Sequence, residues 1–244
     1  MDEKISIVLP TYNEIENIQK VITSVQHVLE RITSNYEIII VDDNSPDGTG
    51  EYVKKISKSN EKVKVLIRKE KTGLGDAYKY GFQHITGDIV FQMDADLSHN
   101  PKDIPKFIRA LKYGDVVVGS RYIKGGGNLL RNKTRIVISK LANFLVSFFF
   151  GLQQTDCTNG FRAYKREVID TIMPYVNSQN YVFLVEMLEK AKQFKFSIRE
   201  VPIYFQDRHD GKSKFSITEV LYFSKEIIKK SFIFSRLIRR KPTK

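Results

Sequence analysis

Short runs of β-branched residues that alternate with helix-like segments constrain the fold more than any other feature of this sequence. Five such runs lie at residues 5–9, 38–41, 63–67, 89–93 and 115–119. Apolar residues recur at helical spacing between the first two runs, from Glu14 to about Ile32, and another helix-like stretch precedes the fourth run. Strands that alternate with helices form βαβ units, so the sequence predicts an α/β fold with a mostly parallel sheet flanked by helices.

Acidic and polar residues follow three of these runs, where the predicted strands end. The segments are PTYNE at 10–14, DDNSPDGT at 42–49 and DADLSH at 94–99. In an open α/β sheet, ligands bind beyond the carboxyl ends of the strands. We therefore expect the three segments to contribute to a single site.

Asp94 and Asp96 are the strongest candidates for metal ligands. They are two residues apart, so in an extended segment their carboxylates would point to the same side. A hard cation such as Mg²⁺ or Mn²⁺ is often held by one or two carboxylates and completes its shell with water and substrate phosphates. A strand-to-helix turn with an aspartate N-cap is the alternative, but the other two acidic strand ends favour a metal site.

Basic charge is concentrated near the C-terminus. Forty Lys and Arg against 28 Asp and Glu give a net charge of +12, which indicates an anionic partner such as nucleic acid, a phosphorylated ligand or a membrane surface. Residues 208–244 carry eleven basic and three acidic side chains, with apolar residues at helical spacing from 217 to 238. This pattern predicts an amphipathic helix at a membrane interface, with a helix docked on the core as the alternative. We divide the chain into a catalytic domain, 1–207, and an interfacial tail, 208–244.

The longest apolar stretch, Leu141 to Leu152, is about half the length of the roughly 20 residues that a spanning helix needs. We expect it to belong to a helix from about Ile136 that lies in the membrane interface, with core packing as the alternative. The glycines at 125–127 and the basic segment after them predict a loop before this helix. The N-terminus has no basic, long apolar signal segment, and the single cysteine fits a reducing compartment.

Several other functions lack their sequence motifs. The segment GKS at 211–213 has no glycine at the position that a P-loop requires, and Gly73 and Gly75 are followed by Tyr78, so there is no dinucleotide fingerprint. The four histidines and one cysteine show no zinc-site spacing. The basic excess lies in an apolar-rich helix without a recognisable nucleic-acid-binding module, so we expect no nucleic-acid partner.

A series of motifs matches a known family in order and spacing. They are LPTYNE (9–14), VDDNSPDGT (41–49), GLGDAY (73–78), MDADLSH (93–99), GSRY (119–122), the segment 131–139, TNGFRAY (158–164) and EVPIYFQDRHDGKSK (200–214). Over nearly its whole length the sequence resembles the polyprenyl-phosphate (dolichyl-phosphate) mannosyltransferases, inverting nucleotide-sugar transferases of GT-A fold. It is similar to the short form of the family, which lacks transmembrane helices.

The resemblance implies a donor site for GDP-mannose. It places Pro10, Tyr12, Glu14, Val41 and Asp43 around the base and ribose. It places Asp94, Ala95 and Asp96 at the diphosphate, the sugar and a Mg²⁺ or Mn²⁺ ion, and Arg208 and Lys214 over the diphosphate. Ser98 stands where many relatives have a metal-liganding glutamine. A weaker serine ligand implies a metal that depends more on the donor diphosphate.

The resemblance also implies an acceptor site. Arg121, Arg135 and Ser139 match positions that hold the lipid phosphate, and guanidinium groups suit phosphate geometry. An ion pair with a nearby aspartate is the alternative for Arg121, and membrane-facing charge is the alternative for Arg208 and Lys214. For Asp156, Gly160 and Arg162 we favour a structural role that organises the helix and loop over the site.

The expected reaction is transfer of mannose to polyprenyl phosphate with inversion. The acceptor phosphate is substantially dianionic at pH 7 and is already a nucleophile, so no general base is required. The expected catalytic residues are Asp94, Asp96, Arg121 and Arg208. The resemblance places the enzyme peripherally on the cytoplasmic face of a membrane. Whether it requires a small membrane-protein partner is left open. A UDP-glucose-dependent transferase and a non-catalytic binding module for nucleotide sugar or lipid phosphate are the alternatives.

Overall fold

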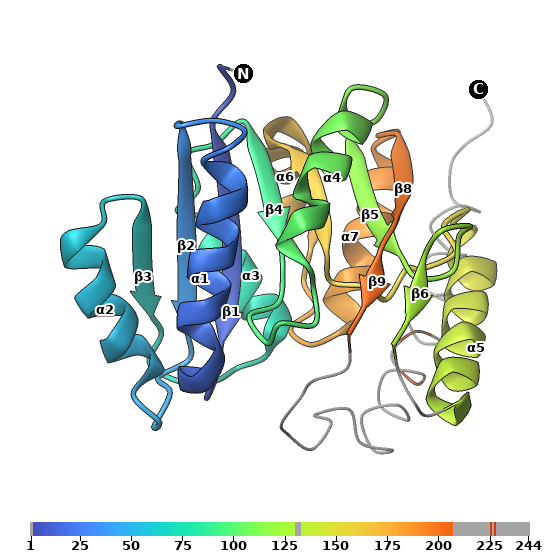
Figure 1. Cartoon of the computed structure of the whole chain (residues 1–244). Coiled ribbons are helices and arrows are strands. Elements are labelled where there is room, and N and C mark those ends of the chain that lie inside the picture. Colours follow the sequence, from blue (N-terminus) through green and yellow to red (C-terminus); the bar gives the residue numbers. More distant parts are fainter. Residues whose placement is uncertain (1, 130–132, 207–224, 226, 228–244) are drawn as a thin grey trace.

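The computed structural model describes residues 2–129 and 133–206, together with Lys225 and Ile227 (Figure 1). In chain order the strands are β1 (Ile5–Thr11), β2 (Tyr36–Asp42), β3 (Val63–Ile67), β4 (Ile89–Gln92), β5 (Val116–Ser120), β6 (Gly127–Asn128), β7 (Arg162–Lys165), β8 (Ile198–Pro202) and β9 (Tyr204–Phe205). The helices are α1 (Ile15–Leu29), α2 (Thr49–Ser59), α3 (Leu74–Phe82), α4 (Ile104–Leu111), α5 (Lys133–Phe150), α6 (Arg166–Ile172) and α7 (Val182–Gln193). Short 3-10 helices lie at Pro101–Asp103 and Met173–Tyr175.

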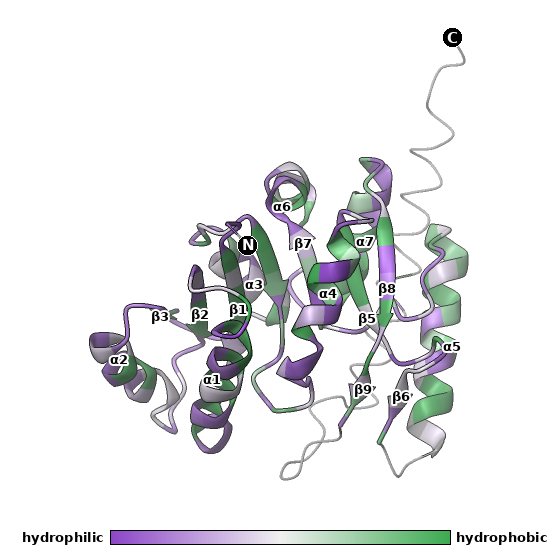
Figure 2. Ribbon diagram, turned by 45° about the horizontal axis from the view of Figure 1, so that its top comes forward, coloured by the Kyte–Doolittle hydropathy of each residue, from purple (hydrophilic) through white to green (hydrophobic). Residues whose placement is uncertain are grey.

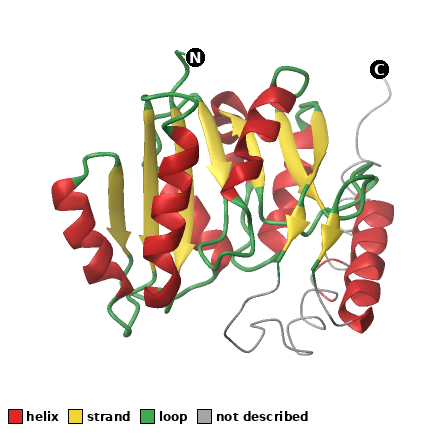
Figure 3. Cartoon of the chain, in the orientation of Figure 1, coloured by secondary structure: helices red, strands yellow, loops and turns green. Residues whose placement is uncertain are grey.

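The main sheet has seven strands in the order β3-β2-β1-β4-β7-β5-β8. The pairs β2–β3, β1–β2, β1–β4 and β5–β8 are parallel, whereas β7 runs antiparallel to both of its neighbours. The mostly parallel α/β fold is therefore confirmed, and each of the five predicted strands is present. Figure 3 shows helices on both faces of the sheet, and the parallel strands end at a common edge.

Alternating residues of each central strand pack into two separate cores. In β2, Ile38 and Ile40 pack with α1 on one face, whereas Ile39 and Val41 pack with α3 and α7 on the other. Because both faces of the sheet are covered, the strand is apolar at every position from 38 to 41 instead of alternating with polar residues. The long β-branched runs of the sequence have this physical cause.

The segment after β5 differs in detail from the sequence expectation. Gly127 and Asn128 pair with β9 in a small parallel ribbon, where we expected a loop. Helix α5 begins at Lys133, about one turn before the expected start at Ile136. None of the helices in the described part of the chain is long and apolar enough to cross a membrane.

The predicted interfacial tail lies outside the described residues except at two positions. Lys225 and Ile227 are helical. Lys225 is exposed, whereas Ile227 is buried in the core on the α3 and α7 side of the sheet. The domain boundary at residue 208 stays a prediction.

Candidate active site

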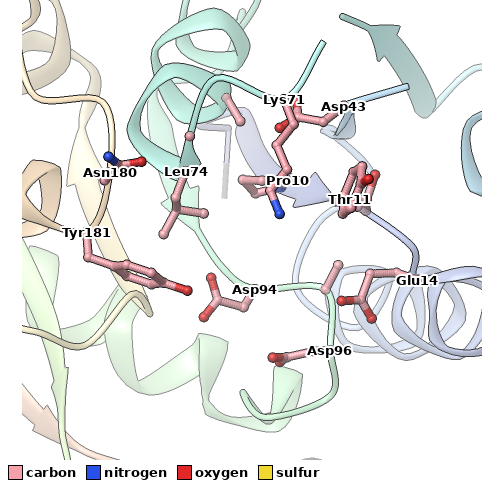
Figure 4. A pocket seen from close by; sticks show the side chains of 14 residues that line it. Pro10, Thr11, Glu14, Asp43, Lys71, Leu74, Asp94, Asp96, Asn180 and Tyr181 are labelled. Atoms are coloured by element: carbon pink, nitrogen blue, oxygen red, sulfur yellow. The ribbon is translucent and has the colours of Figure 1, made fainter. Parts of the chain in front are cut away.

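A pocket opens at the carboxyl ends of β1, β2 and β4 (Figure 4). Its lining residues are Pro10, Thr11, Tyr12, Glu14, Asp43, Lys71, Gly73, Leu74, Ala77, Asp94, Ala95, Asp96, Asn180 and Tyr181. The structure thus brings together seven of the residues assigned to the donor, namely Pro10, Tyr12, Glu14, Asp43, Asp94, Ala95 and Asp96. All three acidic strand ends contribute to the pocket, as the sheet topology predicts.

The carboxylates of the acidic segment after β2 have two roles: two hold the loop in place, and one lines the pocket. Asp42 accepts hydrogen bonds from the hydroxyls of Thr11 and Ser45, and Asp47 accepts from the backbone N–H groups of Thr49 and Ile15. These bonds hold the loop against the first turn of α1. Asp43 is left to line the pocket.

Two basic residues that the sequence analysis did not single out accompany Asp43. Arg68 donates from Nε to Asp43 Oδ1 at 2.6 Å, and both side chains are largely buried. Lys71 lines the pocket and places its Nζ 4.2 Å from the centre of the Tyr12 ring. A cation over an aromatic face is stabilised by the ring quadrupole. Both lie in the short segment between β3 and the GLGDAY motif. This segment has no sequence pattern that would have indicated a binding role.

The glycines of the GLGDAY motif allow a distant segment to reach the pocket. Gly73 has φ 128°, and a Cβ added there would collide with Gln179 and Asn180. Gly75 donates its N–H to the carbonyl of Gln179 at 2.6 Å, at a contact that leaves no room for a side chain. This close approach positions Asn180 and Tyr181 in the pocket, and Tyr181 directs its hydroxyl toward Asp94 (Figure 4).

Asp94 and Asp96 lie in a turn that follows β4, where we expected an extended segment. Leu97 has φ 64°, and the turn lets Asp96 Oδ1 accept hydrogen bonds from the backbone N–H and the hydroxyl of Ser98. Ser98 is buried and does not line the pocket, so its hydroxyl supports Asp96. Val41, likewise, packs its side chain into the core beneath α3.

The two aspartates fit a divalent cation that shares its shell with a ligand. In the described part of the chain, no three His, Cys, Asp or Glu side chains are grouped as a protein-only metal cage requires. Asp94 and Asp96, however, line the same pocket from a single turn. Two carboxylates with phosphate oxygens and water are an ordinary coordination set for Mg²⁺.

Arg121 anchors a second polar cluster, which lies against α5. Its Nε and Nη2 donate to Asp156 Oδ2 and Oδ1 at 2.7 and 2.8 Å, and Nη2 also contacts the hydroxyls of Ser139 at 3.4 Å and Thr158 at 3.2 Å. Burial would lower the pKa of Arg121, but the charge of Asp156 raises it. The ion pair that was the alternative for Arg121 is therefore present, and Ser139 belongs to the same cluster.

Further contacts hold this cluster rigid. Glu200 accepts hydrogen bonds from the backbone N–H groups of Thr155 and Asp156, which fixes the loop that carries Asp156. Arg162 is fully buried and donates to the backbone carbonyls of three residues, Cys157, Asn159 and Leu184. These bonds agree with the structural role expected for Asp156 and Arg162.

Three of the assigned residues cannot be placed in either cluster. Arg135 lies in α5, but its side chain is outside the described atoms. Arg208 and Lys214 lie outside the described residues. Their roles stay predictions from the resemblance.

Comparison with known proteins identifies the family. The sequence profile of glycosyl transferase family 2 matches residues 6–173. A polyprenol monophosphomannose synthase of Mycolicibacterium smegmatis is 38% identical over 218 residues, which are 86% of this chain and 80% of that protein. A dolichol-phosphate mannosyltransferase of Pyrococcus furiosus is 37% identical over 86% of this chain and 59% of its own length. An undecaprenyl-phosphate mannosyltransferase of Micrococcus luteus is 34% identical over 87% of this chain and 88% of that protein.

Solved structures show the same fold. Glucosyl-3-phosphoglycerate synthase from Mycobacterium tuberculosis, in complex with Mn²⁺, UDP and phosphoglyceric acid, superposes with a TM-score of 0.68 at 20% identity. The match covers 93% of this chain and 76% of that one. The mixed sheet flanked by helices is thus the GT-A fold. The chain belongs to glycosyl transferase family 2, and it is a glycosyltransferase of the group that contains the polyprenyl-phosphate mannosyltransferases.

Proposed function

We propose that this enzyme transfers mannose from GDP-mannose to a polyprenyl phosphate with inversion at the anomeric carbon. One observation carries the proposal. Relatives named for mannosyl transfer to polyprenol, dolichol and undecaprenyl phosphate match 86–87% of the chain. The pocket supports it, because seven residues that the resemblance assigns to the donor line the same cavity.

The donor would lie with its nucleoside toward Pro10, Tyr12 and Asp43 and with its diphosphate toward Asp94 and Asp96. These two aspartates would hold Mg²⁺ or Mn²⁺, which would neutralise charge on the departing GDP. The bound Mn²⁺ and UDP of the structural neighbour are consistent with a divalent cation at a site of this fold. Arg208 and Lys214 would close over the diphosphate, as the resemblance implies.

The acceptor phosphate would be oriented by Arg121, Ser139 and Arg135. Its oxygen would attack the anomeric carbon from the side opposite to GDP, so that the new bond forms as the bond to the diphosphate breaks. A phosphate monoester with a second pKa near 6 needs no side chain to remove a proton. The protein's contribution is therefore alignment and charge stabilisation.

The exposed face of α5 would hold the enzyme on the membrane. Figure 2 shows that α5 is largely apolar along its length. The side chains of Val137, Leu141, Phe144 and Phe148 are exposed and follow helical spacing, so they form one stripe. A stripe of this kind can insert into the boundary between headgroups and acyl chains. We therefore propose a peripheral enzyme, on the cytoplasmic face of a membrane as the resemblance implies.

Transfer of radiolabel in detergent tests this function. The full chain is incubated with labelled GDP-mannose and a short-chain polyprenyl phosphate, with and without Mn²⁺, beside a parallel reaction that contains labelled UDP-glucose. We expect a metal-dependent mannolipid whose anomeric configuration is opposite to that of the donor.

Other results would contradict the proposal in different ways. A product from UDP-glucose alone would change the donor while the class of reaction stays. Nucleotide binding without any lipid product would favour the non-catalytic binding module. A mannolipid with the donor's own configuration would exclude inversion.

A further inference from the structure

His99 is a buried histidine with one unpartnered nitrogen close to Asp94. Its ring is almost completely buried. The centre of the ring lies 5.1 Å from that of Phe161 and 5.7 Å from that of Phe205. The backbone N–H of Asp94 donates to His99 Nδ1 at 3.1 Å. Because Nδ1 accepts, the proton of the neutral ring lies on Nε2.

The Nε2 atom faces the Asp94 carboxylate. It has no hydrogen-bond partner in the described part of the chain and lies 3.9 Å from Asp94 Oδ2. A buried N–H group without a partner costs about 1–3 kcal/mol. A shift of about 1 Å in the carboxylate would bring the two atoms within hydrogen-bond distance. The polypeptide therefore holds a donor ready at this oxygen.

Tyr78 approaches the other oxygen of the same carboxylate. Its hydroxyl donates to Asp94 Oδ1 at 3.1 Å, and its ring is fully buried between Phe82 and Phe183. A tyrosine hydroxyl is protonated at neutral pH, so it remains a donor to this carboxylate.

Gly160 leaves space for this arrangement. A Cβ at this position would lie 3.3 Å from both carboxylate oxygens of Asp94 and would crowd them. The carboxylate thus lies between a tyrosine hydroxyl, an imidazole N–H and a glycine. These surroundings restrict its orientation in the pocket.

We propose that Tyr78 and His99 are positioning residues that hold the Asp94 carboxylate from two sides, and that Oδ2 closes onto His99 Nε2 when a metal–nucleotide complex binds. The inference rests on the proposed function, because it assigns Asp94 to that complex. Carboxylates that bind metals are commonly held by hydrogen bonds from a surrounding layer of residues, whose loss lowers metal affinity or activity about 10–100-fold.

Two amide substitutions test the roles of the two ring nitrogens of His99 separately. In His99→Asn, the side-chain oxygen can replace Nδ1 as the acceptor for the Asp94 N–H, but no donor remains at the Nε2 position. In His99→Gln, the longer side chain can place an N–H at the Nε2 position. Tyr78→Phe removes the donor on the other side, and His84→Asn changes an exposed histidine elsewhere as the matched control.

Binding of Mn²⁺ in the presence of GDP, measured by electron paramagnetic resonance, reports on the site without turnover. We expect His99→Asn and Tyr78→Phe to weaken Mn²⁺ binding about 10–100-fold and His99→Gln to recover most of the loss. Binding of GDP without metal should match that of the wild type.

Equal losses in His99→Asn and His99→Gln, in parallel with a lower unfolding temperature, would overturn the proposal in favour of a packing role. The proposal would also be overturned if His99→Gln and Tyr78→Phe both bind Mn²⁺ with wild-type affinity while His99→Asn either binds it equally well or fails to fold. Absence of mannosyl transfer by a wild-type protein that still binds Mn²⁺ with GDP would contradict the proposed function alone.

Discussion

The donor pocket and the cluster against α5 differ in the charged groups that they hold and in the surface beside them. In the pocket, carboxylates of Asp43, Asp94 and Asp96 converge from two strand ends. In the cluster, a guanidinium, that of Arg121, is held by a buried aspartate, Asp156. The adjoining helix exposes apolar side chains on its outer face.

The difference is explained if the two sites bind phosphates of different solubility. A nucleotide sugar arrives from water and can bring a divalent cation to the carboxylates. A lipid phosphate arrives from the bilayer, where a fixed arginine beside an apolar helix surface can meet it. The predictions below test whether the two regions separate in this way.

The largest effect is expected from Asp96→Asn. Asp96 lines the pocket and is held by Ser98, so loss of its charge should reduce transfer at least about a hundredfold. The measurement is the initial rate of mannolipid formation at saturating Mn²⁺. Sedimentation with vesicles should stay at the wild-type level, because Asp96 lines the pocket and does not belong to the exposed stripe of α5.

Asp170→Asn is the matched control for this prediction. Asp170 is exposed and pairs with Arg166 on the surface of α6, so its loss should leave the rate unchanged. A wild-type rate in Asp96→Asn would remove Asp96 from the metal site. It would also remove the proposed contrast between the two regions.

A smaller effect, confined to the acceptor, is expected at the second cluster. Arg121→Met alone would leave the charge of Asp156 buried and unpaired, at a cost of about 3–5 kcal/mol. The double variant Arg121→Met with Asp156→Asn avoids this charge. A hydrogen bond from a charged group contributes about 1.5–3 kcal/mol, so KM for polyprenyl phosphate should rise about 10–100-fold.

The affinity for GDP distinguishes the double variant from Asp96→Asn. The affinity of the double variant for GDP with Mn²⁺ should equal that of the wild type, because Arg121 does not line the donor pocket. Arg109→Met, on the exposed side of α4, serves as the control. Equal losses for donor and acceptor would mean that the two clusters form one site.

A third prediction concerns the surface of α5. Phe144 and Phe148 are 65% and 72% exposed, and transfer of their rings into a bilayer should stabilise the bound state. Replacement of both by serine should lower the vesicle partition coefficient at least about tenfold, since one buried aromatic ring contributes about 1.5–3 kcal/mol. Transfer to a short-chain acceptor in detergent should be unaffected.

Tyr113 and Tyr175 provide the matched control. Both are exposed aromatic residues outside α5, so the same double change to serine should leave vesicle binding intact. Equal partition of the α5 variant and the wild type would contradict the membrane role of this helix.

Much of the sheet was predictable because its strands are buried on both faces. The β-branched residues of β2 pack into the cores on both faces of the sheet, so this segment is strongly predicted to be a buried strand. Strand β7 has no such run, since its four residues RAYK include two basic side chains. Arg162 is tolerated there because the backbone carbonyls of residues 157, 159 and 184 accept hydrogen bonds from its guanidinium. Such a set of partners is not visible in the local sequence.

The site was predictable where it follows strand ends and unpredictable where distant segments meet. Asp94 and Asp96 follow β4 directly, and they line the pocket as expected. Asn180 and Tyr181 enter through contacts between Gly73 or Gly75 and residues 178–180, about a hundred positions away in the chain. The motif at 73–78 was recognised in the sequence, but neither the close approach of a second backbone nor its identity was apparent without the fold.

The smallest functional effect is expected from Glu37→Gln, which should alter stability and leave both regions intact. Glu37 is buried and accepts hydrogen bonds from Ser6, Thr86 and Lys64. Burial alone would raise the pKa of Glu37, but the bonds from Lys64, Ser6 and Thr86 bring it down to about 2 from its usual 4.5. The ionised carboxylate therefore stabilises the folded state at neutral pH.

The sign of the pH dependence follows from this lowered pKa. The contribution of Glu37 is fully present above pH 4.5 and is lost as the pH falls toward 2, where the folded protein also takes up the proton. Urea unfolding at neutral pH should show Glu37→Gln to be less stable than wild type by about 1–3 kcal/mol. The difference should shrink between pH 4.5 and 2, whereas Glu51→Gln, at an exposed i,i+3 pair, should show no such trend. A difference that persists at pH 2 would assign the loss to packing. A change in Mn²⁺-dependent GDP binding or in vesicle binding at neutral pH would show that the two regions depend on the hydrogen bonds of Glu37.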